Sequence, residues 1–217
     1  MGAVLFHTRT LVIDTATAAC SVALIEGEVV IAAAHEAVGR GHAERLVPMI
    51  ASLPDGGRAG HILVDVGPGS FTGIRVGIAA ARALALGWDA SAAGYSSLAS
   101  VAARHLADAA DGLPVAALLE GGHGEVFMQT FAPSPLHALT ELVSLPPAAA
   151  RERCAGMAMA GDGCRWLGDG DPREAPRGAL PHAADALLLP WSLRDLPPRP
   201  LYGRAPDAKV PTGSHRR

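Results

Sequence analysis

One glycine-rich stretch constrains this chain more than any other part of its sequence. It runs from Asp65 to Gly77 as DVGPGSFTGIRVG and follows an apolar segment, His61 to Asp65, that is typical of a strand. Small and apolar residues continue to about Leu86 in a pattern that predicts a helix. Strand, glycine loop and helix in this order present backbone N–H groups to an anion, although any tight strand-to-helix turn uses the same order.

The known nucleotide-binding loops do not fit this stretch. A Walker loop needs Lys and then Ser or Thr after its last glycine, whereas Ile74 and Arg75 follow Gly73 here. The dinucleotide fingerprint needs the spacing G-x-G-x-x-G, whereas Gly67, Gly69 and Gly73 are spaced G-x-G-x-x-x-G. The residue types therefore leave two interpretations open: an anion site, and a structural turn without a ligand.

The chain as a whole predicts a mixed α/β protein. A three-stranded meander is expected near the N-terminus, and its first turn contains Asp14, Thr15 and Thr17. A change of composition near residue 110 divides the chain into a first α/β lobe at 1–110 and a smaller second lobe at 111–217 with a proline-rich C-terminal tail. Strands are predicted at 10–14, 20–25, 29–34, 61–65, 113–119, 126–131 and 155–160, and helices at 42–50, from the glycine-rich stretch to 86, at 96–106 and at 182–189.

Charge and cysteine content argue against several classes of protein. The net charge of −3, with no dominant basic stripe, disfavours nucleic-acid binding by bulk electrostatics. The three cysteines form no C-x-x-C pair, which favours a reducing compartment. No signal-peptide pattern and no run of about 18 uninterrupted apolar residues is present. We therefore expect a soluble cytoplasmic protein with no membrane association.

The predicted helix after the glycine-rich stretch carries one face of small residues. Gly73, Gly77, Ala81 and Ala85 follow one another at intervals of four, so they share that face. Small residues let a second backbone approach closely, either within the chain's own core or in a partner protein. The pattern alone favours the core.

No catalytic constellation is evident in the sequence. The nine histidines include no pair at the H-E-x-x-H spacing, and Ser70 does not lie in a G-x-S-x-G motif. Asp14 with Thr15 and Thr17 is the best remaining polar group. It is suited either to holding a metal-bound phosphate through water or to closing an Asx turn between two strands. We predict no catalytic residue and no metal ligand.

Several segments, in the right order, resemble the bacterial TsaB (YeaZ) family of tRNA threonylcarbamoyladenosine biosynthesis proteins. The GPGSFTG run at 67–73 is highly specific, and the resemblance covers most of the chain. The matching segments are VIDTAT at 12–17, CSVAL at 20–24, HAERL at 42–46 with Pro48, GPGSFTGIRVG at 67–77 and, more loosely, GEVF at 124–127 and YGRAPDAK at 202–209.

The resemblance implies the two-lobed fold of the actin, sugar-kinase and heat-shock ATPase superfamily, with mixed sheets flanked by helices and a compact second lobe. It implies a non-catalytic subunit required for threonylcarbamoyl transfer to adenosine 37 of tRNAs that read codons beginning with A. Such a subunit dimerises with a catalytic TsaD-like subunit, is joined by a TsaE-like ATPase, and forms a homodimer when alone. It meets tRNA only through the complex, and the isolated chain needs no cofactor because ATP and metal belong to the partners.

The resemblance also shifts the interpretation of the small-residue helix toward partner contact. It implies a vestigial phosphate site at Asp14, Thr15 and Thr17. Two other hypotheses remain: an ATP-using enzyme of the superfamily that uses Asp14 and Thr15, and a metallopeptidase-like protein, which the missing ligand pair disfavours. The implied interface consists of Leu46, Met49, Gly73, Ile74, Arg75, Gly77 and Ala81.

The chain departs from the family pattern in the second lobe. The family carries Asp-Ala-Arg before its Gly-Glu-Val, whereas this chain has EGGH at 120–123 and lacks that arginine. Gly203 stands where an apolar residue usually follows Tyr202. These departures leave the role of the second lobe open.

Overall fold

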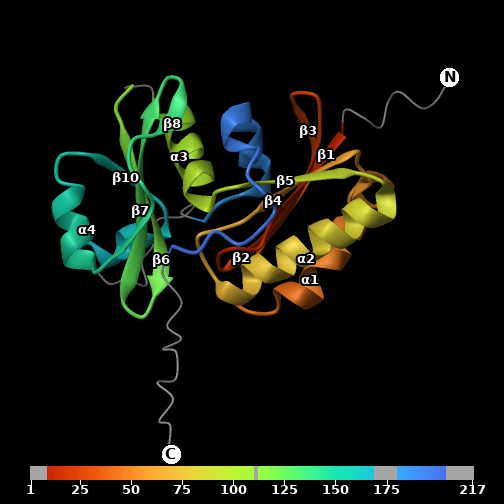
Figure 1. Cartoon of the computed structure of the whole chain (residues 1–217), viewed down its shortest axis with the longest axis horizontal. Helices are drawn as coiled ribbons and strands as arrows, with labels where there is room; N and C mark the ends of the chain where they lie inside the picture. The colour runs from red at the N-terminus through yellow and green to blue at the C-terminus, as the bar shows by residue number, and fades with distance from the viewer. Residues whose placement is uncertain (1–8, 110–111, 169–179, 204–217) are drawn as a thin grey trace, which may run out of the picture.

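The computed structural model describes residues 9–109, 112–168 and 180–203. Two mixed β-sheets lie one on either side of a central helical layer, and further helices cover their outer faces (Figure 1). This confirms the expected fold class of mixed sheets flanked by helices. Among the described residues, no helix has both the length and the apolar character needed to cross a membrane.

The first sheet has the order β3-β2-β1-β4-β5. The meander β1–β2–β3 is antiparallel, and β4 and β5 extend it in parallel on the other side of β1. Val12, for example, lies opposite Ala23 of β2 and Leu63 of β4. The strands are β1 (Arg9–Asp14), β2 (Ala19–Glu26), β3 (Val29–Ala37), β4 (His61–Asp65) and β5 (Ser91–Tyr95).

The second sheet has the order β10-β6-β7-β8, and β9 also pairs with β7. Its centre is the hairpin of β6 and β7, while β10 lies parallel to β6. The strands are β6 (Val115–Gly122), β7 (Glu125–Pro133), β8 (Leu136–Ala138), β9 (Val143–Leu145) and β10 (Ala158–Ala160).

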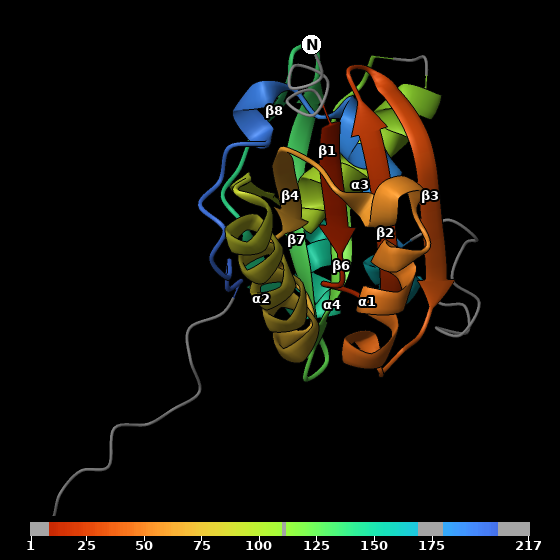
Figure 2. The ribbon, with the colours of Figure 1, turned by 90° about the vertical axis from the view of Figure 1, so that its right-hand side faces the viewer.

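Helices α1 (His42–Ala51) and α2 (Phe71–Trp88) lie side by side on the outer face of the first sheet (Figure 2). Helix α3 (Ser97–Asp108) and the 3₁₀ helix η4 (Ala183–Leu188) lie between the two sheets and share one hydrophobic cluster with both. Helix α4 (Pro147–Arg153) covers the far face of the second sheet. The remaining 3₁₀ helices are η2 (Pro54–Gly57), η3 (Asp162–Trp166) and η5 (Trp191–Leu193).

Burial explains why these segments adopt their structures. Strand β2 is buried on both faces and reads as a nearly continuous apolar run, whereas the edge strand β3 has no fully buried residue. Helix α2 buries its small residues against the sheet, since a Cβ at Gly77 would lie 2.5 Å from Thr15 Oγ1 and 3.4 Å from a methyl group of Val64. Small residues thus bring α2 close to β1 and β4.

The sequence-based expectations missed several elements. Strand β5 has the sequence SAAGY, which lacks the bulky apolar side chains that mark a strand, and β4 recruits it by parallel pairing. Strands β8 and β9 and helix α4 were also missed, since each has seven or fewer residues. The segment at 182–189 forms a 3₁₀ helix rather than an α-helix. The family landmark at 204–209 lies outside the described residues.

The segment at 190–203 returns from the second half of the chain to the first sheet. Gly94 of β5 and Leu196 donate their backbone N–H groups to each other's carbonyl oxygens at 2.6 and 3.0 Å, and Leu201 N donates to Val66 O at 2.8 Å. Arg82 of α2 donates to the carbonyl of Pro198 at 2.6 Å. We call residues 194–203 the strap. The division into lobes at residue 110 remains a proposal, because the strap and α3 join the two halves.

Candidate functional site

The glycine-rich stretch packs directly against the turn between β1 and β2. Ser70 N donates to Ala16 O at 2.6 Å, and a Cβ at Gly69 would lie only 2.0 Å from the same oxygen. A Cβ at Gly73 would likewise lie 2.0 Å from Thr15 O. Any side chain at Gly69 or Gly73 would force the two loops apart. These glycines are therefore needed for a contact within the protein, whether or not a ligand binds.

The polar groups at the start of α2 are largely satisfied within the chain. Ser70 is the N-cap, and its hydroxyl accepts from Gly73 N at 3.2 Å. The Thr15 hydroxyl donates to Gly73 O at 2.7 Å. Because these groups already have partners, the geometry favours the structural turn over the anion site that the sequence left open.

The three residues expected to form a vestigial phosphate site do not form one polar surface. Asp14 and Thr15 are fully buried and Thr17 is nearly so. Thr17 accepts from Ala19 N at 3.3 Å, which closes the β1–β2 turn, and Asp14 accepts from Ala16 N at 3.4 Å. Only Thr17 faces the cleft described below. The Asx-turn alternative therefore matches the observed contacts better.

Asp14 instead belongs to a buried network with Asp65 at the end of β4. Tyr95 OH donates to Asp14 Oδ2 at 3.1 Å. Asp65 accepts from Ser97 Oγ at 2.7 and 2.8 Å and from Gly67 N at 2.7 Å, and it lies close enough to Asp14 for the two carboxyl groups to affect each other's ionisation. The neighbouring strand ends of the parallel pair β1 and β4 thus bring two carboxylic acids together in the core.

Burial sets the protonation of this pair. It raises the pKa of Asp14 well above its usual range, and the adjacent charge of Asp65 raises it further. Burial also raises the pKa of Asp65 to about 6, against the opposing effect of the Ser97 and Gly67 donors. The pKa of Asp14 is raised more strongly than that of Asp65, which has the Ser97 and Gly67 donors, so Asp14 is the member of the pair that favours the protonated form more.

Six of the seven expected interface residues lie inside the chain's own core. Arg75 alone is exposed, while the others pack between α1, α2 and the first sheet. Small residues at intervals of four do mark a close contact, but its partner is β1 and β4 of the same chain. Their burial disfavours direct contact with a partner, and the interface itself stays a prediction. They are Leu46, Met49, Gly73, Ile74, Gly77 and Ala81.

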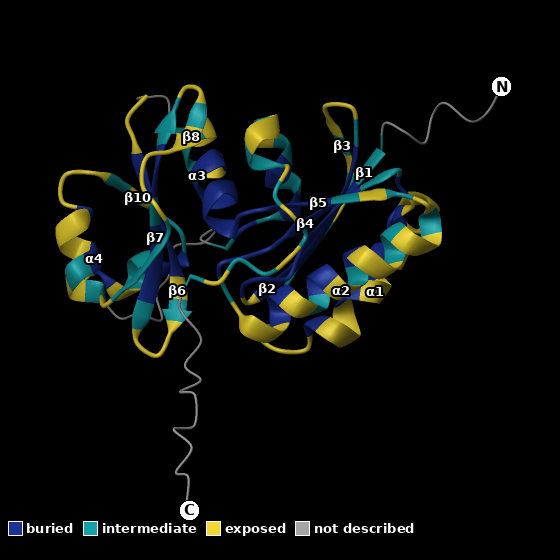
Figure 3. Ribbon diagram, viewed as in Figure 1, coloured by how far each residue is buried: buried dark blue, intermediate teal, exposed yellow. Residues whose placement is uncertain are grey.

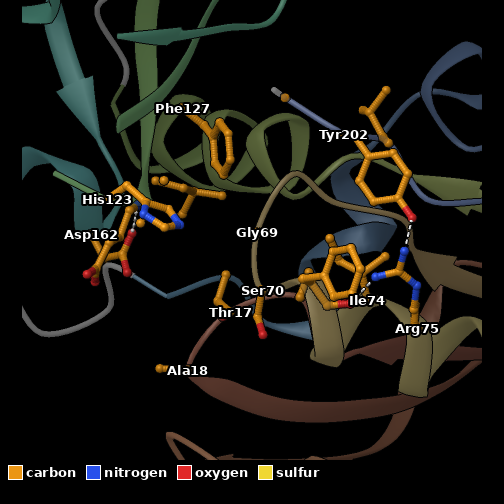
Figure 4. A pocket seen from close by; sticks show the side chains of 18 residues that line it. Thr17, Ala18, Gly69, Ser70, Ile74, Arg75, His123, Phe127, Asp162 and Tyr202 are labelled. Atoms are coloured by element: carbon orange, nitrogen blue, oxygen red, sulfur yellow. Dashed lines mark hydrogen bonds between the residues drawn. The ribbon is translucent and has the colours of Figure 1, made fainter. Parts of the chain in front are cut away.

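A cleft of about 690 Å³ opens between the start of α2 and the second sheet (Figure 4). Its first wall consists of residues 16–18 of the β1–β2 turn and residues 69–71, 74 and 75. Its second wall consists of residues 119–123 at the end of β6 with Phe127 and Asp162, and residues 201–203 of the strap close one side. A volume of this size is typical of small-molecule pockets.

The rim of the cleft is closed by a cluster of Arg75, Phe71 and Tyr202. Arg75 donates to Tyr202 OH at 2.5 Å and to Phe71 O at 3.2 Å, and its guanidinium lies 3.2 Å from the centroid of the Phe71 ring. Behind this rim, a Cβ at Gly203 would lie 2.5 Å from the Phe127 ring. Gly203, which stands where the family usually has an apolar residue, thus leaves the room that the Phe127 ring occupies.

The segment EGGH at 120–123, which replaces the family's Asp-Ala-Arg, forms part of the opposite wall. Glu120 pairs with Arg165 of η3, and its backbone N–H donates to Asp162 Oδ1 at 3.0 Å. His123 and Asp162 both line this wall (Figure 4). Within the described residues, no group of three or more His, Cys, Asp or Glu side chains could hold a metal ion.

The sequence did not single out most of these groups. Asp65 could have been found, because it ends a strand as Asp14 does and parallel strands end at the same edge of a sheet. The residues of the cleft come from several distant segments and share no local pattern. The missed residues are Phe71, Tyr95, Ser97, Leu119, Glu120, His123, Phe127, Asp162, Leu201 and Tyr202.

Comparisons with known proteins agree with the resemblance seen in the sequence. A family model described as "TsaD: tRNA N6-adenosine threonylcarbamoyltransferase" matches residues 34–133. The chain is 43% identical over 101 residues to the tRNA threonylcarbamoyladenosine biosynthesis protein TsaB of Escherichia coli (strain K12), covering 43% of this chain and 42% of that protein. It is 34% identical over 124 residues to TsaB of Bacillus subtilis (strain 168), covering 54% of this chain and 52% of that protein. The matches span about half or less of the length of these curated relatives.

The fold comparison covers more of the chain. A crystal structure titled as an uncharacterized protein with similarity to peptidase YEAZ from Pseudomonas aeruginosa has a TM-score of 0.73 and 29% sequence identity. That match covers 91% of this chain and all of the other. Together, the sequence matches to TsaB proteins over about half of the chain and the fold shared with a YeaZ-like structure support the TsaB (YeaZ) family.

Proposed function

We propose that this chain is a non-catalytic subunit of the machinery that makes threonylcarbamoyladenosine at position 37 of tRNA, and that it acts by binding a TsaD-like catalytic subunit. The family membership supports the pathway, because the curated relatives are named tRNA threonylcarbamoyladenosine biosynthesis proteins. The TsaD model that matches residues 34–133 supports a structural kinship with the proposed partner.

The observation that carries this proposal is the apolar outer face of α1 and α2. The exposed fractions of three large side chains on it are 63% for Val47, 65% for Phe71 and 87% for Leu86. Smaller apolar residues, Ala79 and Ala83, are exposed between the latter two on α2. Figure 3 shows that exposed residues line the outer side of both helices. Apolar residues that recur on one exposed face mark an interaction surface.

This face replaces the inner small-residue face as the proposed contact surface. The inner face is filled by the chain's own sheet, while the two helices together present a broad ridge to solvent. A related subunit with a similar pair of helices can pack its ridge against this one. A second copy of this chain offers the same surface, so we expect the homodimer and the TsaD-like complex to be mutually exclusive.

The contacts at the strand ends support a non-catalytic role. Asp14, Thr15 and Ser70 all make hydrogen bonds within the chain, and none is left free to act on a phosphate. We propose that ATP and metal are held by the partner subunits, that a TsaE-like ATPase joins the pair, and that tRNA contacts the assembled complex rather than the isolated chain.

Co-expression with the TsaD-like protein of the same organism tests the proposal. Leu86→Glu and Val47→Glu place a charge on the outer face without disturbing a buried side chain, so both variants should fold but bind the partner at least about tenfold more weakly. Leu139→Glu is the matched control, because Leu139 is 50% exposed and lies next to β8 of the second sheet. Co-purification of the Leu86 and Val47 variants at the level of the control would refute this interface.

Threonylcarbamoyl transfer by the reconstituted complex provides a second readout. The outer-face variants should reduce transfer in parallel with binding, and the control should not. Transfer by the TsaD-like subunit that is equally fast with and without this chain would refute the accessory role itself.

A further inference from the structure

The cleft of about 690 Å³ has no assigned ligand, and its charges restrict what it can hold. Among the described residues that line it, the charged side chains are Arg75 at the rim and Glu120 and Asp162 on the opposite wall. Arg75 is already bonded to Tyr202 OH and Phe71 O and lies on the Phe71 ring. It is therefore part of the rim rather than a free group for an anionic ligand.

The opposite wall has more negative than positive charge. Arg165 pairs with Glu120, which leaves Asp162 without a cation of its own. Asp162 is only 7% exposed, and its Oδ1 accepts from the neutral backbone N–H of Glu120 at 3.0 Å. Burial raises the pKa of Asp162, and the Glu120 N–H and then the charge of Arg165 oppose this effect only in part. A buried carboxylate with this little compensation favours a bound cation.

An anion such as a nucleotide phosphate finds few free donors here. On the first wall, Ser70 N donates to Ala16 O, and the N–H of Gly73 is taken by the Ser70 hydroxyl. A phosphate brought to the second wall would face the carboxylates of Glu120 and Asp162. Charge and hydrogen bonding thus disfavour a phosphorylated ligand on both walls.

The remaining surface of the cleft is apolar. Ile74 contributes from α2, Leu119 and Phe127 from the second sheet, and Leu201 from the strap. Figure 4 shows the Phe127 ring between the His123–Asp162 wall and the Tyr202 rim. An apolar body of roughly ten non-hydrogen atoms fits easily in a pocket of this size. Aromatic faces near a carboxylate also suit an ammonium group.

We propose that the cleft binds a small organic amine, with its ammonium group at the Asp162 carboxylate and its apolar body against Phe127, Leu119 and Ile74. Such a ligand supplies the missing positive charge and covers the apolar wall. Of the outer-face residues named above, Phe71 also lines the cleft, whereas Val47 and Leu86 do not, so variants at those two positions and at Asp162 let either proposal fail without the other.

Titration of the full chain with phenethylamine, followed by NMR, tests this assignment. 2-Phenylethanol is the neutral probe of the same size, phenylacetate is the anionic one, and magnesium ATP represents a nucleotide. Phenethylamine should shift the signals of cleft residues and bind at least about tenfold more tightly than 2-phenylethanol, because only the amine pairs with the carboxylate. Phenylacetate and ATP should neither bind there nor displace the amine.

Two variants and a control locate the site. Asp162→Asn keeps an acceptor for Glu120 N but removes the charge, so phenethylamine should lose its advantage over 2-phenylethanol. Asp108→Asn removes an exposed carboxylate far from the cleft and should leave binding unchanged. Ala18→Phe adds a ring at an exposed position of the cleft wall and should block both probes.

Three outcomes would overturn the proposal. One is the absence of phenethylamine binding at millimolar concentration, and another is equal or tighter binding of phenylacetate or 2-phenylethanol. The third is an amine preference that survives in the Asp162→Asn variant, since the ammonium would then lie elsewhere. Displacement of phenethylamine by ATP would instead reassign the cleft to nucleotides.

Discussion

The buried pair of Asp14 and Asp65 leads to a prediction about stability and pH. Both pKa values are raised in the folded protein, so the folded state binds more protons than the unfolded chain above pH 4. The stability that these two groups contribute to the fold is fully present below their unfolded pKa values. It is lost as pH rises through their folded pKa values. For Asp65, the rise from 3.8 to about 6 corresponds to about 3 kcal/mol.

Asp14→Asn should remove the part of this pH-dependent loss of stability that comes from residue 14. The asparagine keeps the size of Asp14 and an acceptor oxygen, but the unfolded chain no longer gains from ionising residue 14. That gain grows as pH rises above the unfolded pKa, because the raised pKa of Asp14 makes its ionisation less favourable in the folded protein. One imperfect replacement bond, to Tyr95 or Ala16, subtracts about 1 kcal/mol. The variant should therefore be more stable than the parent at pH 7, by an amount on the order of 1 kcal/mol, and no more stable at pH 4.

Denaturant unfolding between pH 4 and pH 8 measures this difference. Asp108→Asn is the control, because Arg104 holds the pKa of the exposed Asp108 below its usual range and the sign of its contribution is reversed. That control should lose a little stability at neutral pH and none at low pH. The reasoning fails if Asp14→Asn destabilises the protein equally at every pH, or if the parent becomes more stable between pH 4 and pH 7.

The remaining predictions concern glycines and can be checked by thermal unfolding. Gly69→Ala should destabilise the protein by several kcal/mol, roughly 3 or more, because its Cβ would meet Ala16 O at 2.0 Å. A Cβ at Gly87 in α2 would have no atom within 4 Å, so Gly87→Ala should instead stabilise the helix by about 0.5–1 kcal/mol. A loss of stability in Gly87→Ala as large as that in Gly69→Ala would contradict the steric explanation. Gly203→Ala should destabilise the strap by driving a methyl group into the Phe127 ring, and Phe127→Leu should relieve part of that loss in the double variant.

The fold class could be predicted from the sequence because each main strand and helix carries a local pattern. Strand β2 is a continuous apolar run, and the glycine-rich stretch marks the passage from β4 to α2. Strand β5 carries no such pattern, because its identity depends on pairing with β4 rather than on its own side chains. The missed elements are those whose structure is set by distant neighbours.

The same dependence on distant neighbours explains why the sequence does not show what the predicted interface residues contact. Intervals of four show that Gly73, Gly77 and Ala81 share a face of α2, but they do not identify what that face contacts. The contact is with Thr15 and Val64, which are distant in the sequence. Helix α2 is also apolar on its opposite side, where Leu86 is 87% exposed, so its hydrophobic pattern does not distinguish inside from outside. The cleft was beyond prediction for a related reason, since its walls come from several distant segments.

The path of the strap has a consequence for the order in which the protein can be assembled. The first sheet is encoded by residues 9–95, yet its β5 edge is paired by Leu196 and its Val66 carbonyl by Leu201. Its inner face is covered by η4, at residues 183–188. During synthesis, the sheet therefore leaves the ribosome well before the segments that complete it. Until then its inner face and its β5 edge are open to pairing with other chains, and exposure of this kind favours aggregation.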